Sequence, residues 1–199
     1  MRKGYSRMAH AAVAALSALL PSAVSAQSAP LVIEMRGGVA TPVGSFSDGT
    51  APGEGATSGV SMGLDLAFSG SGRRTFYVGF SQHRFACEAG GCTSGGEFVA
   101  TGFDAGFRFN LLTRGTVIPW LRVGAVTSRV ESPGLDTSAP GLGGTGYGGE
   151  VGVGVYLGAW SSVAFNPGVR LTRVNTDLPG DVVLRMRYVV ADLGLSLAF

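Results

Sequence analysis

The chain has 199 residues, a length typical of one domain, and only 14% of them are charged, against about a quarter in an average protein. Hydrophobic residues make up 45%, so the low hydrophobicity and high net charge of disordered chains are both absent. Glycine is frequent, with 33 residues. The composition therefore indicates a folded domain that carries few charges.

Residues 1–26 have the three regions of a secretory signal peptide. Three basic residues stand before position 8, an apolar run follows at 11–20, and Val24-Ser25-Ala26 provides the cleavage positions. The run is too short to cross a hydrocarbon core of about 30 Å as a helix. We therefore expect cleavage after Ala26, which leaves a mature domain at residues 27–199.

The leader also changes the charge balance. It holds three of the fifteen Lys and Arg residues, including the one Lys, so twelve arginines remain against thirteen acids. The mature chain is nearly neutral and has no run of basic residues, which excludes nucleic-acid binding.

After the leader, no apolar stretch is long enough for a membrane helix, and apolar residues recur instead at every second position. Eight segments show this alternation: 31–39, 60–68, 76–83, 99–111, 119–125, 147–157, 163–172 and 189–199. The connections alternate in length, long at 41–58, 86–97, 130–146 and 174–182, and short at 69–74, 112–116 and 158–162. A soluble sandwich has no reason to sort its loops in this way. The pattern predicts an all-β fold, an eight-stranded antiparallel up-and-down transmembrane β-barrel with long outer loops and short periplasmic turns.

The carboxyl end carries a resemblance to a known class of proteins. Residues 189–199 end in Phe199 with Leu193, Leu195 and Leu197 at alternate positions, and they resemble the terminal strand of bacterial outer-membrane barrels. Residues 38–46 resemble the first strand and loop of small eight-stranded barrels of the OmpA/OmpX type. The likeness extends over residues 31–199 and lies in pattern, with no catalytic motif.

This resemblance implies a location in the outer membrane of a Gram-negative-type cell, in contact with outer-membrane lipid and lipopolysaccharide. It also implies that the barrel assembly machinery reads Leu193, Leu195, Leu197 and Phe199 as an assembly signal.

The polar face of the strands carries charges that would point into the barrel. An eight-stranded barrel has just enough interior for side chains to fill it, and unpaired charges there would be costly. We therefore expect these residues to form a lumen charge network that closes and stiffens the barrel. A narrow, porin-like pore or a small-ligand-binding barrel lined by the same residues is the alternative. The expected members are Glu34, Arg36, Asp65, Asp104, Arg108, Arg122, Glu150, Arg170 and Asp192.

Arg185 and Arg187 interrupt the apolar face of the last strand. A charge on the lipid face at mid-depth costs about 2–4 kcal/mol. We place both residues near the outer rim, or across a bulge that changes the alternation.

Cys87 and Cys92 lie in one predicted loop, and export would bring them into an oxidising compartment. We expect a disulfide between them. A zinc site would need four ligands, which this loop does not offer, so no metal site is predicted.

Some outer-membrane barrels modify lipids with a Ser/His pair on the barrel wall. Here Ser81 and His83 share one face of a strand, so such an enzyme is a second alternative. The alternation points both side chains inward, away from lipid. We therefore predict no catalytic residues and no cofactor, and a structural or surface-interaction role in which the long loops meet an unknown partner.

Overall fold

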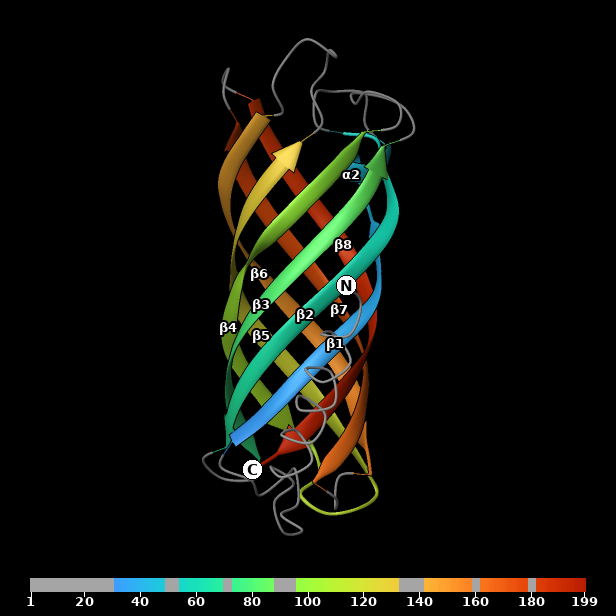
Figure 1. The fold of residues 1–199 in the computed structure, drawn as a ribbon, viewed down its shortest axis with the longest axis vertical. Coiled ribbons are helices and arrows are strands. Elements are labelled where there is room, and N and C mark those ends of the chain that lie inside the picture. The colour runs from blue at the N-terminus through green and yellow to red at the C-terminus, as the bar shows by residue number, and fades with distance from the viewer. Residues whose placement is uncertain are drawn as a thin grey trace, which may run out of the picture.

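A computed structural model describes residues 31–48, 54–69, 73–87, 96–132, 142–158, 162–178 and 182–199. Each strand pairs antiparallel with the next one in the chain, and the last pairs with the first, so the sheet closes without a free edge (Figure 1). The elements are β1 (Leu31–Pro42), α2 (Ser45–Asp48), β2 (Ala56–Ser69), β3 (Arg74–Cys87), β4 (Glu97–Asn110), β5 (Val117–Ser132), β6 (Leu142–Leu157), β7 (Val163–Leu178) and β8 (Val182–Ala198).

The predicted fold class, an eight-stranded antiparallel up-and-down barrel, is confirmed. Among the described residues, no helix has the length and apolar character needed to cross a membrane. The predicted signal peptide, residues 1–26, and residues 27–30 lie outside the described part of the chain.

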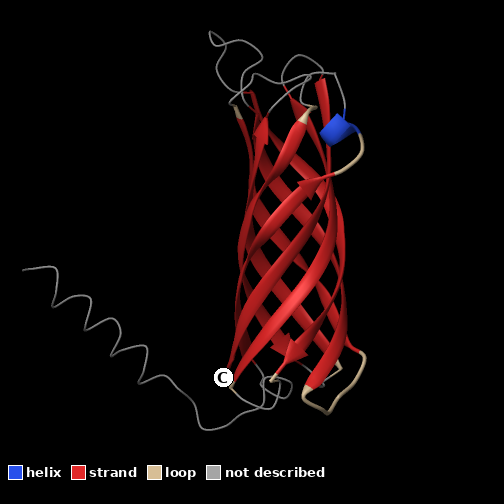
Figure 2. Cartoon of the chain, turned by 90° about the vertical axis from the view of Figure 1, so that its right-hand side faces the viewer, coloured by secondary structure: helices blue, strands red, loops and turns tan. Residues whose placement is uncertain are grey.

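The two ends of the barrel differ. The amide of Phe199 donates to the carbonyl of Leu31 at 2.9 Å, so the last strand and the first meet at one end. Figure 2 shows α2 at the opposite end. The short connection between β4 and β5, yellow-green in Figure 1, lies at the same end as the C-terminus.

Several strands are longer than their apolar alternation. The segment 174–182, expected to be a long loop, is mostly strand, because β7 continues to Leu178 and β8 begins at Val182. The segment 130–146 is likewise shortened by β5 and β6. Backbone hydrogen bonds continue where the outward side chains become polar, so hydropathy alone ends these strands too early.

The structure places Arg185 and Arg187 on the outside of the barrel, near the end that carries α2. We call this end the loop end. The register of β7 and β8 runs without a shift from the Val163–Leu197 pair to the Leu178–Val182 pair, and Arg187 lies opposite Arg173. The structure therefore agrees with a position near the outer rim. It shows no bulge between β7 and β8 that would change the alternation. A register shift does occur in the β2–β3 pair, between Ala56 and Gly59.

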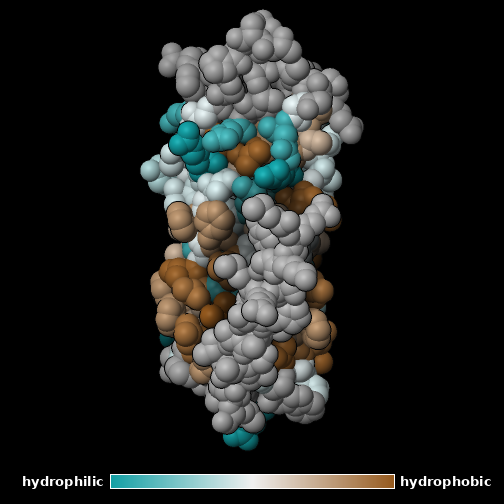
Figure 3. All heavy atoms as spheres, in the orientation of Figure 1, coloured by the Kyte–Doolittle hydropathy of each residue, from teal (hydrophilic) through white to brown (hydrophobic). Residues whose placement is uncertain are grey.

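The outer surface of the wall carries large hydrophobic side chains exposed to the surroundings. Phe103, Val60 and Leu193 are each more than half exposed. On the face drawn in Figure 3, such residues gather in the lower part, and hydrophilic residues lie above them, towards the end that carries α2. An apolar surface of this extent is typical of a binding or membrane-contacting face and not of a wall in water.

Candidate functional site in the barrel lumen

Nine charged residues of the strands meet inside the barrel. They come from every strand except β3, and their side chains are almost fully withdrawn from solvent. The structure places all nine predicted members here: Glu34 and Arg36 of β1, Asp65 of β2, Asp104 and Arg108 of β4, Arg122 of β5, Glu150 of β6, Arg170 of β7 and Asp192 of β8. Their positions follow from the period of two, because each lies on the inward face of its strand.

Arg122 is the centre of this network. Its Nη1 lies 2.5 Å from Asp65 Oδ2, and its Nε lies 2.5 Å from Glu150 Oε1. Its Nη2 also donates to Asp104. The guanidinium lies 3.6 Å from the centre of the Tyr77 ring, and the Tyr77 hydroxyl donates to Glu150 at 2.9 Å. One planar cation thus holds three carboxylates from three other strands, which suits the fixed fork of donors that arginine presents.

A second group forms around Glu34. Arg108 binds this carboxylate with two nitrogens, at 2.8 and 3.0 Å, and also donates to the hydroxyl of Tyr156. Asn166 donates to Glu34 at 2.6 Å, and Ser196 donates to it at 3.1 Å. Glu34 is therefore held by two-pronged, charge-assisted contacts and further donors, the arrangement in which a buried charge is best compensated.

Arg36 and Arg170 connect the remaining acids. Arg170 donates to Asp192 with two nitrogens, at 2.9 and 2.5 Å, and its Nη1 lies 3.3 Å from Glu150. Arg36 donates to Asp65 at 2.6 Å. The four arginines and five acids form one connected set of ion pairs that crosses the lumen from wall to wall.

Gly79 of β3 provides the space in which two of these acids meet. A Cβ atom at this position would overlap the carboxylate oxygens of Asp65 and Asp104. The missing side chain thus allows both carboxylates to approach Arg122.

Above the charged network, towards the end that carries α2, the lumen is filled by apolar and aromatic side chains that the sequence interpretation did not identify as a group. Phe46 of α2 is fully buried and packs edge-on against Phe85 and Phe98, with ring centres 5.2 and 5.5 Å apart. Met186 and Tyr188 of β8 belong to the same cluster. We call Phe46, Phe85, Phe98, Met186 and Tyr188 the outer aromatic cluster.

Part of the outer aromatic cluster has a signal in the sequence. Phe85 follows His83 by two residues, so the alternation of the strand places both side chains on the inward face. Phe46 lies in a predicted loop, and no periodicity shows that its ring turns back into the barrel.

The polar partners Tyr77, Trp120, Tyr156 and Asn166 were also missed. Trp120 donates to Asn166 at 2.7 Å, which orients the amide that binds Glu34. The aromatic members lie on the inward faces of their strands. An aromatic ring on an otherwise polar face is the sequence signal that could have identified them as partners of the charges.

Ser81 and His83 are both buried on the lumen side of β3. The His83 ring packs against Tyr188, with centres 5.0 Å apart. Its Nδ1 has no hydrogen-bond partner among the described residues. The pair therefore does not lie on the outer wall, where a lipid substrate would approach.

Cys87 ends β3 with a buried side chain, and Cys92 lies outside the described residues. The disulfide between them stays a prediction. Leu193, Leu195, Leu197 and Phe199 lie in or directly after β8, and their role as an assembly signal also stays a prediction.

Solved structures of similar fold identify the architecture. Neisserial surface protein A superposes with a TM-score of 0.64 and 16% identity, covering 85% of this chain and 97% of that one. The N-terminal β-barrel domain of OprF from Pseudomonas aeruginosa gives a TM-score of 0.51 and 12% identity, covering 86% and 98%. This chain has the fold of small outer-membrane barrels. The predicted resemblance to such barrels is confirmed, at the level of fold.

The sequence itself matches no family model and no curated protein. At identities of 16% and 12%, the two structures share the backbone arrangement with this barrel but give no information on individual side chains.

Proposed function

We propose that the protein is an integral barrel of the outer membrane of a Gram-negative-type cell, with a closed lumen and a structural or surface-interaction role. The observation that carries this proposal is the inverted distribution of side chains. Large hydrophobic residues are exposed on the outer wall, while arginines and acids are buried inside. Hydrocarbon around the wall makes this arrangement favourable, and water around it would not.

A location in the outer membrane would also account for several features of the chain. Residues 1–26 would direct export, the carboxyl end would be read by the barrel assembly machinery, and the outer wall would contact lipid and lipopolysaccharide. The long outer loops would be presented to an unknown partner. Neisserial surface protein A, whose name places that protein at a surface, has a similar fold and supports this role.

Two barriers in series support a closed lumen. The ion pairs around Arg122 cross the barrel, and the outer aromatic cluster fills the region above them. A narrow pore would require both layers to open.

The closed lumen predicts that the folded protein does not conduct. We expect planar bilayers that contain the purified barrel to show no steady ion-selective openings, because the ion pairs and the outer aromatic cluster would interrupt a continuous water path. Flotation of proteoliposomes from the same preparation controls for insertion. Reproducible openings of one conductance, found only with the inserted protein, would show that the lumen is a pore.

The proposed location predicts which end is accessible from outside. A short tag inserted between β5 and β6, within residues 133–141, should be labelled on intact cells by a reagent that cannot cross the outer membrane. A tag inserted at 112–116 should be labelled only after lysis. Both tagged proteins should show a heat-dependent shift in gel mobility, which reports the folded barrel. Labelling of both positions, or of neither, on intact cells would contradict the proposed orientation.

A further inference from the structure

Two arginines face each other on the outer wall without a carboxylate between them. Arg173 of β7 and Arg187 of β8 are directly opposite in the register, and both side chains are exposed. Arg185 lies two residues nearer to the loop end. Like charges directly across a strand pair repel each other, so this position is destabilising unless an anion is present.

Two other outward arginines near this end have acidic partners. Arg84 lies 3.8 Å from Glu97, and Arg129 lies 3.4 Å from Glu131. Within the described part of the chain, no acid lies within ion-pair distance of Arg173 or Arg187. Arg173 and Arg187 therefore form a facing pair of cations without an acidic partner in that part of the chain, and Arg185 adds a third positive charge nearby.

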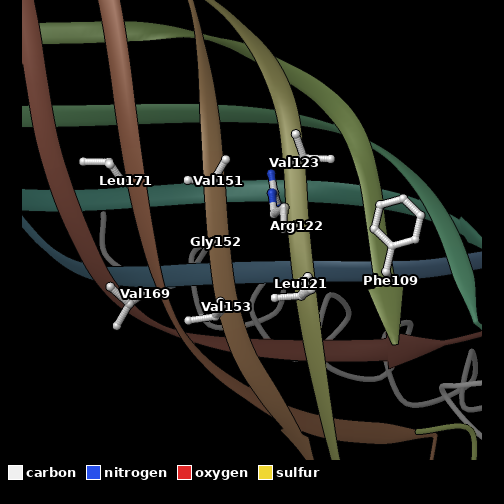
Figure 4. A pocket seen from close by; sticks show the side chains of 9 residues that line it. All are labelled: Phe109, Leu121, Arg122, Val123, Val151, Gly152, Val153, Val169 and Leu171. Atoms are coloured by element: carbon white, nitrogen blue, oxygen red, sulfur yellow. The ribbon is translucent and has the colours of Figure 1, made fainter. Parts of the chain in front are cut away.

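Below the two arginines, an apolar hollow follows β6. Val151 and Val153 form its floor, and Leu121 of β5 and Val169 of β7 stand at its sides (Figure 4). This hollow is open to the surroundings and has a volume of about 510 Å³. Small-molecule sites have volumes of about 300–1,000 Å³.

A second hollow joins this one to the arginines. This open hollow has a volume of about 400 Å³. It shares Val123, Val151 and Leu171 with the first and reaches Arg173 and Arg187. Gly149 lies directly opposite Arg173 in the register. Because glycine has no side chain, nothing on β6 separates the guanidinium from the hollow below it.

The register fixes the order of these features along the wall. Gly149, Arg173 and Arg187 are neighbours across three strands, and two residues further from the loop end the neighbours are Val151, Leu171 and Val189. Each such step is about 6.6 Å along a strand. The cationic position thus lies at the loop end of the hollow, and the apolar part extends away from it.

We infer that this surface binds a phosphorylated glycolipid of the outer leaflet. Its phosphate would lie between Arg173 and Arg187, and one acyl chain would lie in the hollow over Val151 and Val153. Two guanidiniums match the planar, charge-assisted contacts that phosphate prefers, and the phosphate removes the repulsion between them. The assignment to the outer leaflet rests on the orientation given under Proposed function, which puts the loop end outside.

The test measures lipid retention by native mass spectrometry. The full barrel is refolded from denaturant into a non-ionic detergent, so that it carries no cellular lipid. It is then titrated with diphosphoryl lipid A, with a phosphate-free glycolipid of similar chain length, and with phosphatidylglycerol. We expect the diphosphoryl lipid to bind at least roughly tenfold more tightly than the phosphate-free lipid, which can make neither charge-assisted contact. It should also bind more tightly than phosphatidylglycerol, because a phosphate monoester has more charge and one more free oxygen than a phosphodiester.

Matched variants locate the site. Arg173→Gln combined with Arg187→Gln should lower binding of the diphosphoryl lipid by roughly tenfold or more. Arg84→Gln combined with Arg129→Gln removes the same charge from the same end and should leave the binding unchanged. Val151→Phe fills the hollow and should weaken binding several-fold, whereas Leu64→Phe on β2 should not. All substituted positions are outward-facing, and the gel shift checks folding.

Each other outcome overturns the inference. Equal losses in the two arginine pairs would show general charge attraction, and equal binding of phosphatidylglycerol would show a site for any anionic lipid. If the wild-type barrel does not distinguish the diphosphoryl from the phosphate-free lipid, no phosphate site exists. Binding in detergent is independent of orientation in the cell, so failure of the loop-labelling experiment would be recognised separately.

Discussion

Replacing Arg122 with Met is expected to destabilise the barrel by about 3–5 kcal/mol. The substitution leaves Asp65, Asp104 and Glu150 close together without the cation that binds all three. Removing one partner of a buried ion pair is costly because the remaining charge has no water to replace the lost contact. Urea-induced unfolding in lipid vesicles, followed by the loss of heat-modifiable gel mobility, measures the change.

The control for this experiment is Arg129→Met. Arg129 is about three-quarters exposed and forms one ion pair, with Glu131. An exposed pair contributes at most about 1 kcal/mol, so the control should be close to wild type. Equal unfolding midpoints for the two variants would show that Arg122 does not hold the network together.

The Glu34–Arg108 pair should show strong coupling. Glu34→Leu alone leaves Arg108 buried without its two-pronged partner, and Arg108→Met alone leaves Glu34 unbalanced. Each single variant should lose about 3–5 kcal/mol, while replacing a buried pair as a whole by apolar residues is often neutral. The double variant should therefore be more stable than either single one.

A double-mutant cycle on the free energy of unfolding checks this prediction. The matched cycle is Arg84→Met with Glu97→Leu, an exposed pair for which we expect almost no coupling. If the losses at Glu34 and Arg108 add, the two residues act independently, and the ion pair described above contributes little.

Much of the fold follows from the sequence, because alternation has a direct structural cause. A strand turns every second side chain to the same side, so the alternation alone places Asp65 and Glu150 inside the barrel. The number of alternating segments predicts the strand number, and the alternation of long and short connections predicts the barrel. The length of the strands does not follow from the alternation. β7 and β8 continue to pair at Arg173 and Arg187, where the outer face is polar.

The partners within the lumen could not be predicted from the alternation. Whether Asp65 meets Arg122 or Arg170 depends on the stagger between strands and on the tilt that the strands adopt when the sheet closes, and hydropathy contains neither. The ring of Phe46 is a similar case, because a turn of four residues directs it into the barrel. The sequence therefore predicts the charged lumen as a set of residues but not as a set of contacts.

The ion pairs and hydrogen bonds of the lumen join residues that are far apart in the chain. The Asp65–Arg122 ion pair spans 57 positions, and the hydrogen bond from Asn166 to Glu34 spans 132. A partly assembled sheet therefore contains charged groups whose partners lie on strands that have not yet paired. Such an intermediate is tolerable only while water still hydrates the concave side. We therefore expect assembly to be slow and cooperative. The pairing of β1 with β8 should close the barrel last, and water should leave the interior after this closure.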